Sequence, residues 1–340
     1  METLLDTSLE QRARIKKAIP AFGGKASHYA ELATVPGVPV PKAFGIPIYY
    51  YDQFMKENGF DSRVETLLAD STFQSDPMVR DEELRKLRSD MKAAPINAEF
   101  IAALTAKLQS QYRGIRMRFR SSTNAEDLEG FTGAGLYTSK SGDLNDPDKR
   151  IEDAIRKVWA SVWFFRAFEE RAFRSIAHLK VGMALLVHRS FPDEYANGVA
   201  ITANIFDSSG QNPAFYINVQ RGEASVVIPE AGVHSDEILY QYYNEGQPAQ
   251  YLRHSTEVSQ GENVLSLSQL FAVGQALDAI HRHFAESYGG DPNQFYGMDV
   301  EFKFDDLTPG GEIELQVKQA RPHPGRGQTS PETGGGKCVK

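Results

Sequence analysis

The sequence predicts an α+β fold, in which helices and antiparallel strands are mixed rather than alternating as in a doubly wound sheet. Two stretches, at about 146–165 and 266–289, carry apolar residues at the spacing of a long helix. Strand-like runs lie between these helices and after the second one, in an order that indicates hairpins. The strand-like runs are 181–189, 198–206, 213–219, 224–229, 298–304 and 312–319.

The first third of the chain is predicted to be mainly helical. A Gly-Gly-Lys turn at 23–25 opens a helix that runs to about residue 32, and a less regular helical segment covers roughly 52–112. The apolar residues Met117 and Phe119 then alternate with polar ones, as in a half-buried strand. This strand leads the chain to Arg120.

The boundaries of the two long helices are predicted from their end residues. Asp146 followed by Pro147 is typical of an N-cap with proline at the first helical position. Ser266 and Gln269 have the spacing of a capping box. Gly289 is a suitable residue to end the second helix.

The composition is that of a globular protein with a sizeable core. Hydrophobic residues make up 41% of the 340 residues and charged residues 24%. The formal net charge of -8 argues against nucleic-acid binding. No apolar run approaches the roughly 18 residues of a membrane span, and the charged N-terminus does not resemble a signal peptide. The lone cysteine, Cys338, excludes an intramolecular disulfide. We therefore expect a cytoplasmic protein without nucleic-acid or membrane partners.

The last stretch, 324–340, lacks hydrophobic periodicity and is rich in Gly, Pro, Ser and Thr. This composition predicts a disordered tail or a linker. Its GGGK sequence resembles a phosphate-binding loop, but Pro331 and Cys338 stand where that motif needs a glycine and a hydroxyl residue. We therefore do not interpret it as a nucleotide site.

The two strands predicted at the C-terminal end carry polar residues in a regular pattern. In the first, Asp299 and Glu301 share the face opposite the apolar residues. In the second, Gln319 continues the apolar face, and Arg321 follows on the same parity. Carboxylates beside a glutamine and an arginine are suited to a magnesium ion and the phosphates that it bridges. The alternative is a solvated sheet face with an ordinary strand-end arginine. On strand parity alone, this alternative is favoured over a magnesium site.

Two further segments have features of phosphate binding. The segment 118–137 combines Arg120 with an acidic pair and a loop that contains Gly133 and Gly135, and such loops let backbone N–H groups approach phosphate oxygens. A mobile surface turn is the alternative. Lys25 lies near a helix N-terminus, where it can reach an anion, unless it is an ordinary exposed lysine.

Together these segments resemble the nucleotide-binding domain of the pyruvate phosphate dikinase and phosphoenolpyruvate synthase family. The resemblance covers roughly residues 20–323, and the loop sequence is also similar to that of glucan water dikinases. The motifs that carry it are GGKA (23–26), RSSTNAEDLEG (120–130), FTGAG (131–135), MDVEF (298–302) and KQARP (318–322).

The resemblance implies an ATP-grasp fold over residues 1–323, in which two or three α+β subdomains clamp ATP. The expected subdomain boundaries are approximately 1–115, 116–235 and 236–323. It also implies a role for each matching residue. The expected phosphate-binding residues are Lys25, Arg120 and Arg321, and those expected to hold Mg²⁺ are Glu301, Gln319 and Asp299. The expected nucleotide contacts are Gly133, Gly135, Met183, Val187, His188 and Glu223.

In this family, a histidine on a separate swivelling domain attacks the β-phosphoryl group of ATP and releases AMP. The resemblance therefore implies an ATP-dependent phosphotransferase of the dikinase type. No phosphohistidine segment is visible in the sequence, so the expected partner is a swivelling domain or a protein that acts in trans. Two alternatives remain: a stand-alone ATP-grasp kinase that acts on a small molecule or glucan, and a non-catalytic nucleotide-binding module.

Overall fold

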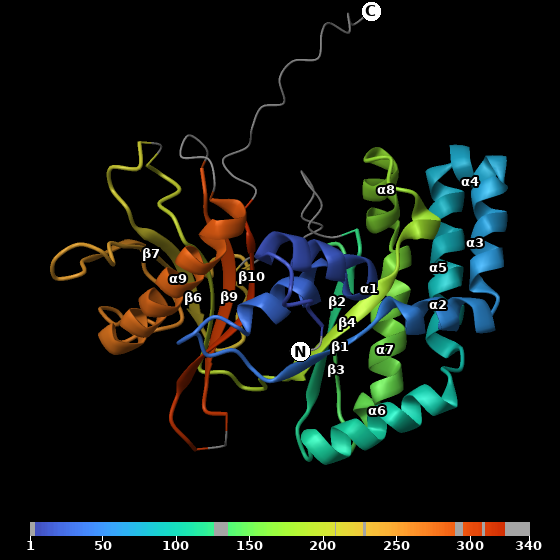
Figure 1. Cartoon of the computed structure of the whole chain (residues 1–340), viewed down its shortest axis with the longest axis horizontal. Coiled ribbons are helices and arrows are strands. Elements are labelled where there is room, and N and C mark those ends of the chain that lie inside the picture. The colour runs from blue at the N-terminus through green and yellow to red at the C-terminus, as the bar shows by residue number, and fades with distance from the viewer. Residues whose placement is uncertain are drawn as a thin grey trace, which may run out of the picture.

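The computed structural model describes residues 4–125, 135–207, 209–226, 229–289, 295–307 and 310–323. It contains a four-stranded and a six-stranded antiparallel sheet, together with helices, so the predicted α+β class is confirmed. In Figure 1 the six-stranded sheet lies on the left with helix α9, and the four-stranded sheet lies on the right with a layer of helices. Helix α1 lies between the two halves.

Helix α1 (Gln11–Leu32) is kinked at Gly23, which has φ of 74° and ψ of 166°. A β-carbon at this position would lie 2.2 Å from the carbonyl oxygen of Ser122. Glycine is therefore required here both for the positive φ and for the close approach to the neighbouring strand. The predicted Gly-Gly-Lys start of a helix corresponds to the second half of α1, which runs from the kink to Leu32.

The four-stranded sheet has the order β1-β4-β2-β3. One face packs against helices through a core that includes Phe119, Trp159 and Leu185. The other face packs against α1, where Tyr29 contacts Leu186. The strands are β1 (Ala43–Ile46), β2 (Met117–Thr123), β3 (Lys140–Gly142) and β4 (Met183–Arg189).

The helical layer beside this sheet agrees with the helical segment predicted at 52–112. Aspartate or asparagine side chains cap three of its helices by accepting backbone N–H groups, as Asp76 does at α5. The helices are α2 (Ile48–Glu57), α3 (Phe60–Ala69), α4 (Ser71–Ser75), α5 (Pro77–Ala93), α6 (Ala98–Gln111), α7 (Ile151–Ala160) and α8 (Phe165–Phe173). Of three 3₁₀ turns, η2 (Ser161–Trp163) connects α7 to α8, η1 (Pro147–Lys149) lies between β3 and α7, and η3 (His178–Lys180) lies between α8 and β4.

The six-stranded sheet has the order β10-β9-β5-β6-β7-β8, with every neighbouring pair antiparallel. Helix α9 (Leu267–Tyr288) covers its apolar face, where Phe284 packs in the same core as Val300 and Phe302. The strands are β5 (Ala196–Ile201), β6 (Phe215–Arg221), β7 (Asp236–Tyr240), β8 (Ala249–Arg253), β9 (Met298–Asp305) and β10 (Glu314–Pro322).

The ends of the predicted helices are partly confirmed. The capping box of Ser266 and Gln269 is present, and α9 ends before Gly289. Asp146 caps only the 3₁₀ turn η1, and the α-helix begins at Ile151. The strand predicted at 224–229 is wrong for the part that the structure describes, since 224–226 has no strand. Strands β7 and β8 were not predicted.

The face assigned to Gln319 by strand parity is wrong. A β-bulge between Val317 and Gln319 shifts the register, so that Val317 lies opposite Phe302 but Gln319 lies opposite Glu301. The extra residue is Lys318. Gln319 therefore lies on the polar face of the sheet rather than on the apolar face, because a bulge reverses the alternation of side chains that follows it.

A buried polar network joins α1 to α9. The Glu31 carboxylate, which is fully buried, accepts hydrogen bonds from Arg14 and Gln11 within α1 and lies 2.8 Å from Nε2 of His283 in α9. Burial of this kind is stable only when the charge is paired and hydrogen-bonded. The network therefore fixes α9 against the helix that carries Lys25. Among the residues that the structure describes, no helix is long and apolar enough to cross a membrane.

Candidate functional site

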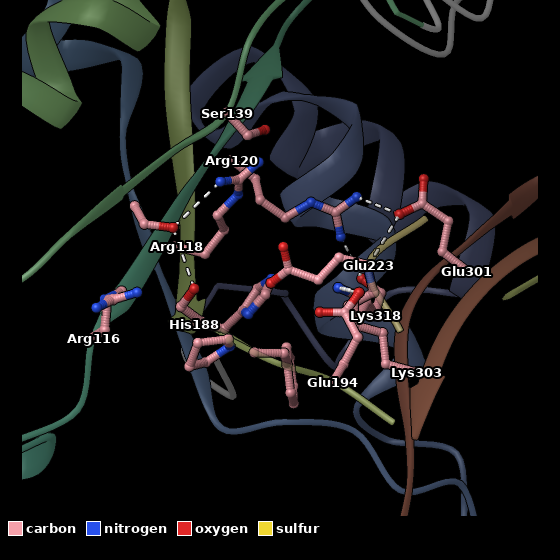
Figure 2. A pocket seen from close by; sticks show the side chains of 14 residues that line it. Arg116, Arg118, Arg120, Ser139, His188, Glu194, Glu223, Glu301, Lys303 and Lys318 are labelled. Atoms are coloured by element: carbon pink, nitrogen blue, oxygen red, sulfur yellow. Dashed lines mark hydrogen bonds and ion pairs between the residues drawn. The ribbon is translucent and has the colours of Figure 1, made fainter. Parts of the chain in front are cut away.

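A pocket of about 410 Å³ lies where the two sheets meet, within the range of about 300–1,000 Å³ typical of ligand sites. Strands β2 and β4 form one wall and β9 and β10 the other, as Figure 2 shows. The lining residues are Arg116, Arg118, Arg120, Ser139, Ser141, His188, Ser190, Phe191, Pro192, Glu194, Glu223, Glu301, Lys303 and Lys318.

Positive charge exceeds negative charge in this lining. Five arginine and lysine side chains face three glutamates. Two of the glutamates are paired, Glu301 with Arg120 and Glu194 with Lys303. Arg118 donates to the hydroxyl of Ser141, and no carboxylate pairs with it among the described residues. A surplus of cations and hydroxyl groups in a concave site favours an anionic ligand.

Arg120 lies at the centre of the site and bridges the two halves of the molecule. From β2 it donates through Nη2 to Oε2 of Glu301 at 2.8 Å and to Oε1 of Gln319 at 2.7 Å. Its Nη1 donates to the carbonyl oxygen of Lys318 at 2.8 Å. Figure 2 shows the side chain extended from β2 towards Glu301.

Glu301 is the electrostatic focus of these cations. Burial by itself would raise the pKa of its carboxyl group, but the nearby positive charges outweigh burial and lower the pKa to about 2. Glu301 is therefore ionised at neutral pH. The charges that act on it belong to Arg120, Lys318, Lys25 and Arg321. The fold thus brings cations from three separate motifs of the sequence around a carboxylate from a fourth.

Lys25 reaches this region from the second half of α1. Its Nζ donates to the carbonyl oxygen of Ser121 at 2.7 Å, and the backbone N–H of Ala26 donates to Oγ of Ser122. Both contacts tie α1 to β2, beside Arg120. The position of Lys25 therefore depends on the kink at Gly23, which brings this part of α1 against the strand.

The residues predicted to hold magnesium are neighbours on β9 and β10. Gln319 lies opposite Glu301, and Arg321 lies opposite Asp299, with which it forms an ion pair of 3.1 Å. Within the described ranges, no group of three or more histidine, cysteine, aspartate or glutamate side chains could hold a metal ion. Magnesium, however, is commonly bound through one or two carboxylates together with substrate phosphates. The oxygens of Glu301 and Gln319 already converge on one cationic nitrogen, so this donor set fits magnesium.

His188 lines the pocket and has one buried hydrogen-bond acceptor without a partner in the described part of the chain. Its ring is 2% exposed, and Nδ1 lies 2.6 Å from the carbonyl oxygen of Arg189, so this nitrogen carries the proton. Nε2 is buried and has no hydrogen-bond partner within the described part of the chain. Burial and the positive charges of Arg120, Lys318 and Arg118 hold the pKa of His188 well below its usual range. The ring is therefore neutral.

The other two residues predicted on β4 point away from the pocket. Met183 and Val187 are fully buried in the core that packs against the helices, on the face of the sheet opposite His188. Side chains alternate along a strand, so residues 183 and 187 cannot share a face with 188. Their side chains therefore do not line this pocket, and a contact between this part of β4 and a nucleotide stays a prediction.

Of the remaining predicted nucleotide contacts that the structure describes, only Glu223 is among the residues that line the pocket. Glu223 lines the pocket and accepts from the backbone N–H of Asp193 at 3.2 Å. Gly135 has φ of 72° but is not among the lining residues. Gly133 and the acidic pair Glu126-Asp127 lie outside the described residues. The role of the glycine loop stays a prediction.

Several charged residues of the pocket were not predicted. Lys303 follows Glu301 on the same face of β9, so strand parity indicates its position. Lys318 lies on the polar face by the same alternation, because Leu315 and Val317 face the core. The bulge, for which the sequence gives no clear signal, then places Gln319 on that face as well. Burial lowers the pKa of Lys318 to about 7, with Arg120 and Lys303 acting in the same direction and Glu301 against it.

Comparisons with known proteins agree with this chemistry. The family model described as "Pyruvate phosphate dikinase, AMP/ATP-binding domain" matches residues 19–334. A probable phosphoenolpyruvate synthase of Staphylothermus marinus is 27% identical over 51% of this chain and 21% of its own length. Rifampicin phosphotransferases are also similar. That of a Streptomyces species is 28% identical over 54% of this chain, and that of Bacillus subtilis 26% over 62%. The matches cover only 21% and 24% of these two proteins.

Proposed function

The chain belongs to the pyruvate phosphate dikinase AMP/ATP-binding domain family, and on this basis we propose that it is the ATP-dependent part of a phosphotransferase of the dikinase type. ATP occupies the pocket between the two sheets, and the two halves that enclose it form an ATP-grasp fold. The observation that carries the proposal is the convergence of Lys25, Arg120 and Arg321 around Glu301, because these residues come from three distant parts of the chain.

The two ends of the pocket suit the two ends of ATP. The cations around Glu301 neutralise the triphosphate, since arginine forms paired hydrogen bonds to phosphate oxygens and lysine adds a point charge. His188 and Phe191 provide ring surfaces for the base at the other end. The centroids of the two rings are 6.0 Å apart. Together these groups hold the phosphates in a fixed position relative to an incoming nucleophile.

Glu301, Gln319 and Asp299 would hold Mg²⁺, which would neutralise charge on the phosphates during the reaction. The residues of the chain itself bind and orient ATP. In the proposed transfer, a nitrogen of an acceptor histidine forms a bond to the β-phosphorus as the bond from that phosphorus to the α-bridging oxygen breaks. AMP leaves with this oxygen, and the β- and γ-phosphoryl groups move to the histidine. Water then attacks the γ-phosphorus as its bond to the β,γ-bridging oxygen breaks, so that inorganic phosphate leaves and the β-phosphoryl group stays on the histidine.

The acceptor histidine belongs to a swivelling domain or to a protein in trans. The chain spans about a quarter or less of the three relatives named above, so the parts of those proteins that it does not match include room for such a domain. The names of these relatives refer to two different compounds, phosphoenolpyruvate and rifampicin. The final acceptor is therefore not defined by the domain that they share with this chain.

The test is to incubate the purified chain with Mg²⁺ and ATP, with and without lysate of its source, and to identify the nucleotide products. AMP that depends on lysate is expected, because the acceptor is supplied in trans. ADP would instead indicate an ordinary kinase, and binding without turnover would indicate a nucleotide-binding module.

Two variants test the assignment of the site. Glu301→Ala and Arg321→Ala are expected to lose magnesium-dependent ATP binding and turnover while they remain folded. Unchanged nucleotide affinity and activity in both variants would contradict the site.

A further inference from the structure

The side chain of Arg120 occupies the point at which the two best-placed magnesium ligands converge. One nitrogen, Nη2, lies 2.8 Å from Oε2 of Glu301 and 2.7 Å from Oε1 of Gln319. Arg120 is 8% exposed and approaches these oxygens from β2, across the pocket from β9 and β10 (Figure 2). A positive group thus already fills the position between the two oxygens.

A divalent metal ion and this guanidinium group cannot use the same oxygens together. Magnesium needs oxygen ligands at about 2.0–2.1 Å. A nitrogen that donates to both oxygens blocks this approach, and its positive charge repels the ion. The metal therefore binds here only after Arg120 has moved away.

A phosphate group provides the reason for Arg120 to move. Guanidinium groups bind phosphate oxygens through strong, often paired, hydrogen bonds that can replace those to Glu301 and Gln319. The other cations near Glu301 are less able to block the metal. The Nζ atom of Lys318 is 3.9 Å from Oε2 of Glu301, and Arg321 is paired with Asp299.

We infer that Arg120 is a positioning residue that competes with the metal ion for Glu301 and Gln319 and gives them up when nucleotide binds. The inference rests on the proposed function, since it concerns the same site. Its consequence is positive coupling: the metal alone binds weakly, and each ligand strengthens the binding of the other by the same factor. This arrangement keeps the site from filling with metal in the absence of ATP.

The test is a titration with Mn²⁺, which carboxylate and carbonyl oxygens also bind and which is detected by electron paramagnetic resonance. Each protein is titrated with and without a non-hydrolysable ATP analogue. In the wild-type chain, the analogue is expected to tighten Mn²⁺ binding by about five-fold or more, within the usual range of coupling between sites. In Arg120→Ala, Mn²⁺ alone is expected to bind more tightly than to wild type, and the coupling is expected to be smaller than in wild type. The coupling that remains comes from the phosphates of the analogue, which also bind the metal.

Arg118→Ala is the matched control, because Arg118 is a cation on the same face of β2 that makes no contact with the two oxygens. This variant is expected to keep the coupling and to show a smaller change in the affinity for Mn²⁺ alone. Arg120→Lys, which retains the charge but not the planar fork, is expected to be intermediate. Thermal unfolding of each variant verifies that it is folded, and Arg120→Lys serves as the second test if Arg120→Ala does not fold.

The inference is overturned if Arg120→Ala binds Mn²⁺ alone no more tightly than wild type does. It is also overturned if Arg118→Ala produces an equal increase, since net charge alone would then explain the effect. Both results are compatible with tight binding of the ATP analogue by the wild-type chain, which would leave the proposed function intact. Failure of the wild-type chain to bind the analogue would instead contradict the proposed function itself.

Discussion

The Nδ1 atom of His188 lies 2.6 Å from the carbonyl oxygen of Arg189, which places the ring proton on that nitrogen and leaves Nε2 as a buried acceptor in the pocket. A phosphate oxygen cannot satisfy this acceptor, because it has no proton to donate at neutral pH. An amino group on the base of a nucleotide can do so. His188 has two aromatic neighbours, Phe191 and Tyr29. The Tyr29 ring is parallel to that of His188, with ring centroids 6.1 Å apart. These aromatic groups suit the base of the nucleotide.

His188→Leu is therefore expected to weaken ATP binding by about five-fold, which corresponds to the loss of one hydrogen bond of about 1 kcal/mol. Binding of purine riboside triphosphate, which lacks the amino group, is expected to change little. Calorimetric titration of both nucleotides measures the difference. His188→Gln retains an acceptor and is expected to restore part of the preference. Equal losses for both nucleotides would contradict a contact between His188 and the amino group.

Lys25→Met is expected to weaken ATP binding by about ten-fold or more, in line with the loss of a charged hydrogen bond. Adenosine binding is expected to change little, since the proposed contact of Lys25 is to phosphate. Competition titrations with ATP and adenosine provide the comparison. Lys16→Met, an exposed lysine on the first half of the same helix, is the control for loss of charge. Equal losses for ATP and adenosine would mean that Lys25 does not contact the phosphates.

Gly23→Ala is expected to destabilise the fold by about 2 kcal/mol or more, because the new methyl group adds a steric clash to a strained φ. The clash is with Ser122, whose carbonyl oxygen would lie 2.2 Å from the added carbon. Gly37→Ala is a matched control, since Gly37 has φ of 78° and no atom within 4 Å of such a carbon. Denaturant unfolding of both variants separates the clash from the strain. Equal destabilisation would show that the approach of α1 to β2 does not require glycine.

Glu31→Gln is expected to lower the stability at neutral pH and to flatten the loss of stability in acid. Burial would raise the pKa of Glu31, but the hydrogen bonds from His283 and Arg14 outweigh it and lower the pKa from its ordinary value of 4.5 to about 2. The ionised form therefore stabilises the fold above about pH 4.5, and this contribution is lost as the pH falls towards 2. Its size is on the order of 3 kcal/mol.

The measurement is urea unfolding of wild type and Glu31→Gln at several pH values from about 2 to about 7. This range includes the pH values at which the carboxyl group titrates in the folded and unfolded states. The two stability curves are expected to converge at the acid end. Glu82→Gln is the control, because Glu82 forms ion pairs with Arg85 and Lys86 on the exposed surface of α5, where such pairs contribute little. A constant difference between wild type and Glu31→Gln across the whole range would show that the charge of Glu31 is not responsible.

Much of the fold could be predicted from local patterns, but not all of it. The capping box at Ser266 specifies the start of α9, because it acts within a few residues. Strands β7 and β8 carry mixed polar and apolar residues, and only β7 has a clear buried face. Strand β7 pairs with β6, and β8 pairs with β7. These pairings are determined by tertiary packing, which local patterns do not report.

For the candidate site, motif resemblance indicated Lys25, Arg120 and Glu301, which the fold brings together. It did not indicate which residues of β4 face the pocket, because the similar segment spans the whole strand and does not distinguish alternate positions. Parity makes this distinction, since it places His188 on one face and Met183 and Val187 on the other. Lys318 lies in the KQARP motif and Arg118 in the segment 118–137, but the resemblance assigned neither of them a role.

The extra residue at the bulge, Lys318, reverses the alternation of side chains in the rest of β10. Before it, the odd-numbered residues Leu315 and Val317 face the core, and after it the even-numbered Ala320 does. If β10 were replaced by a regular strand without a bulge, that strand would have to be one residue shorter than β10. Only then would its glutamine and arginine face the pocket. Conversely, deletion of Lys318 would leave Gln319 opposite Glu301 and remove only the lysine. The length of this strand, as well as its composition, thus determines which side chains reach the pocket.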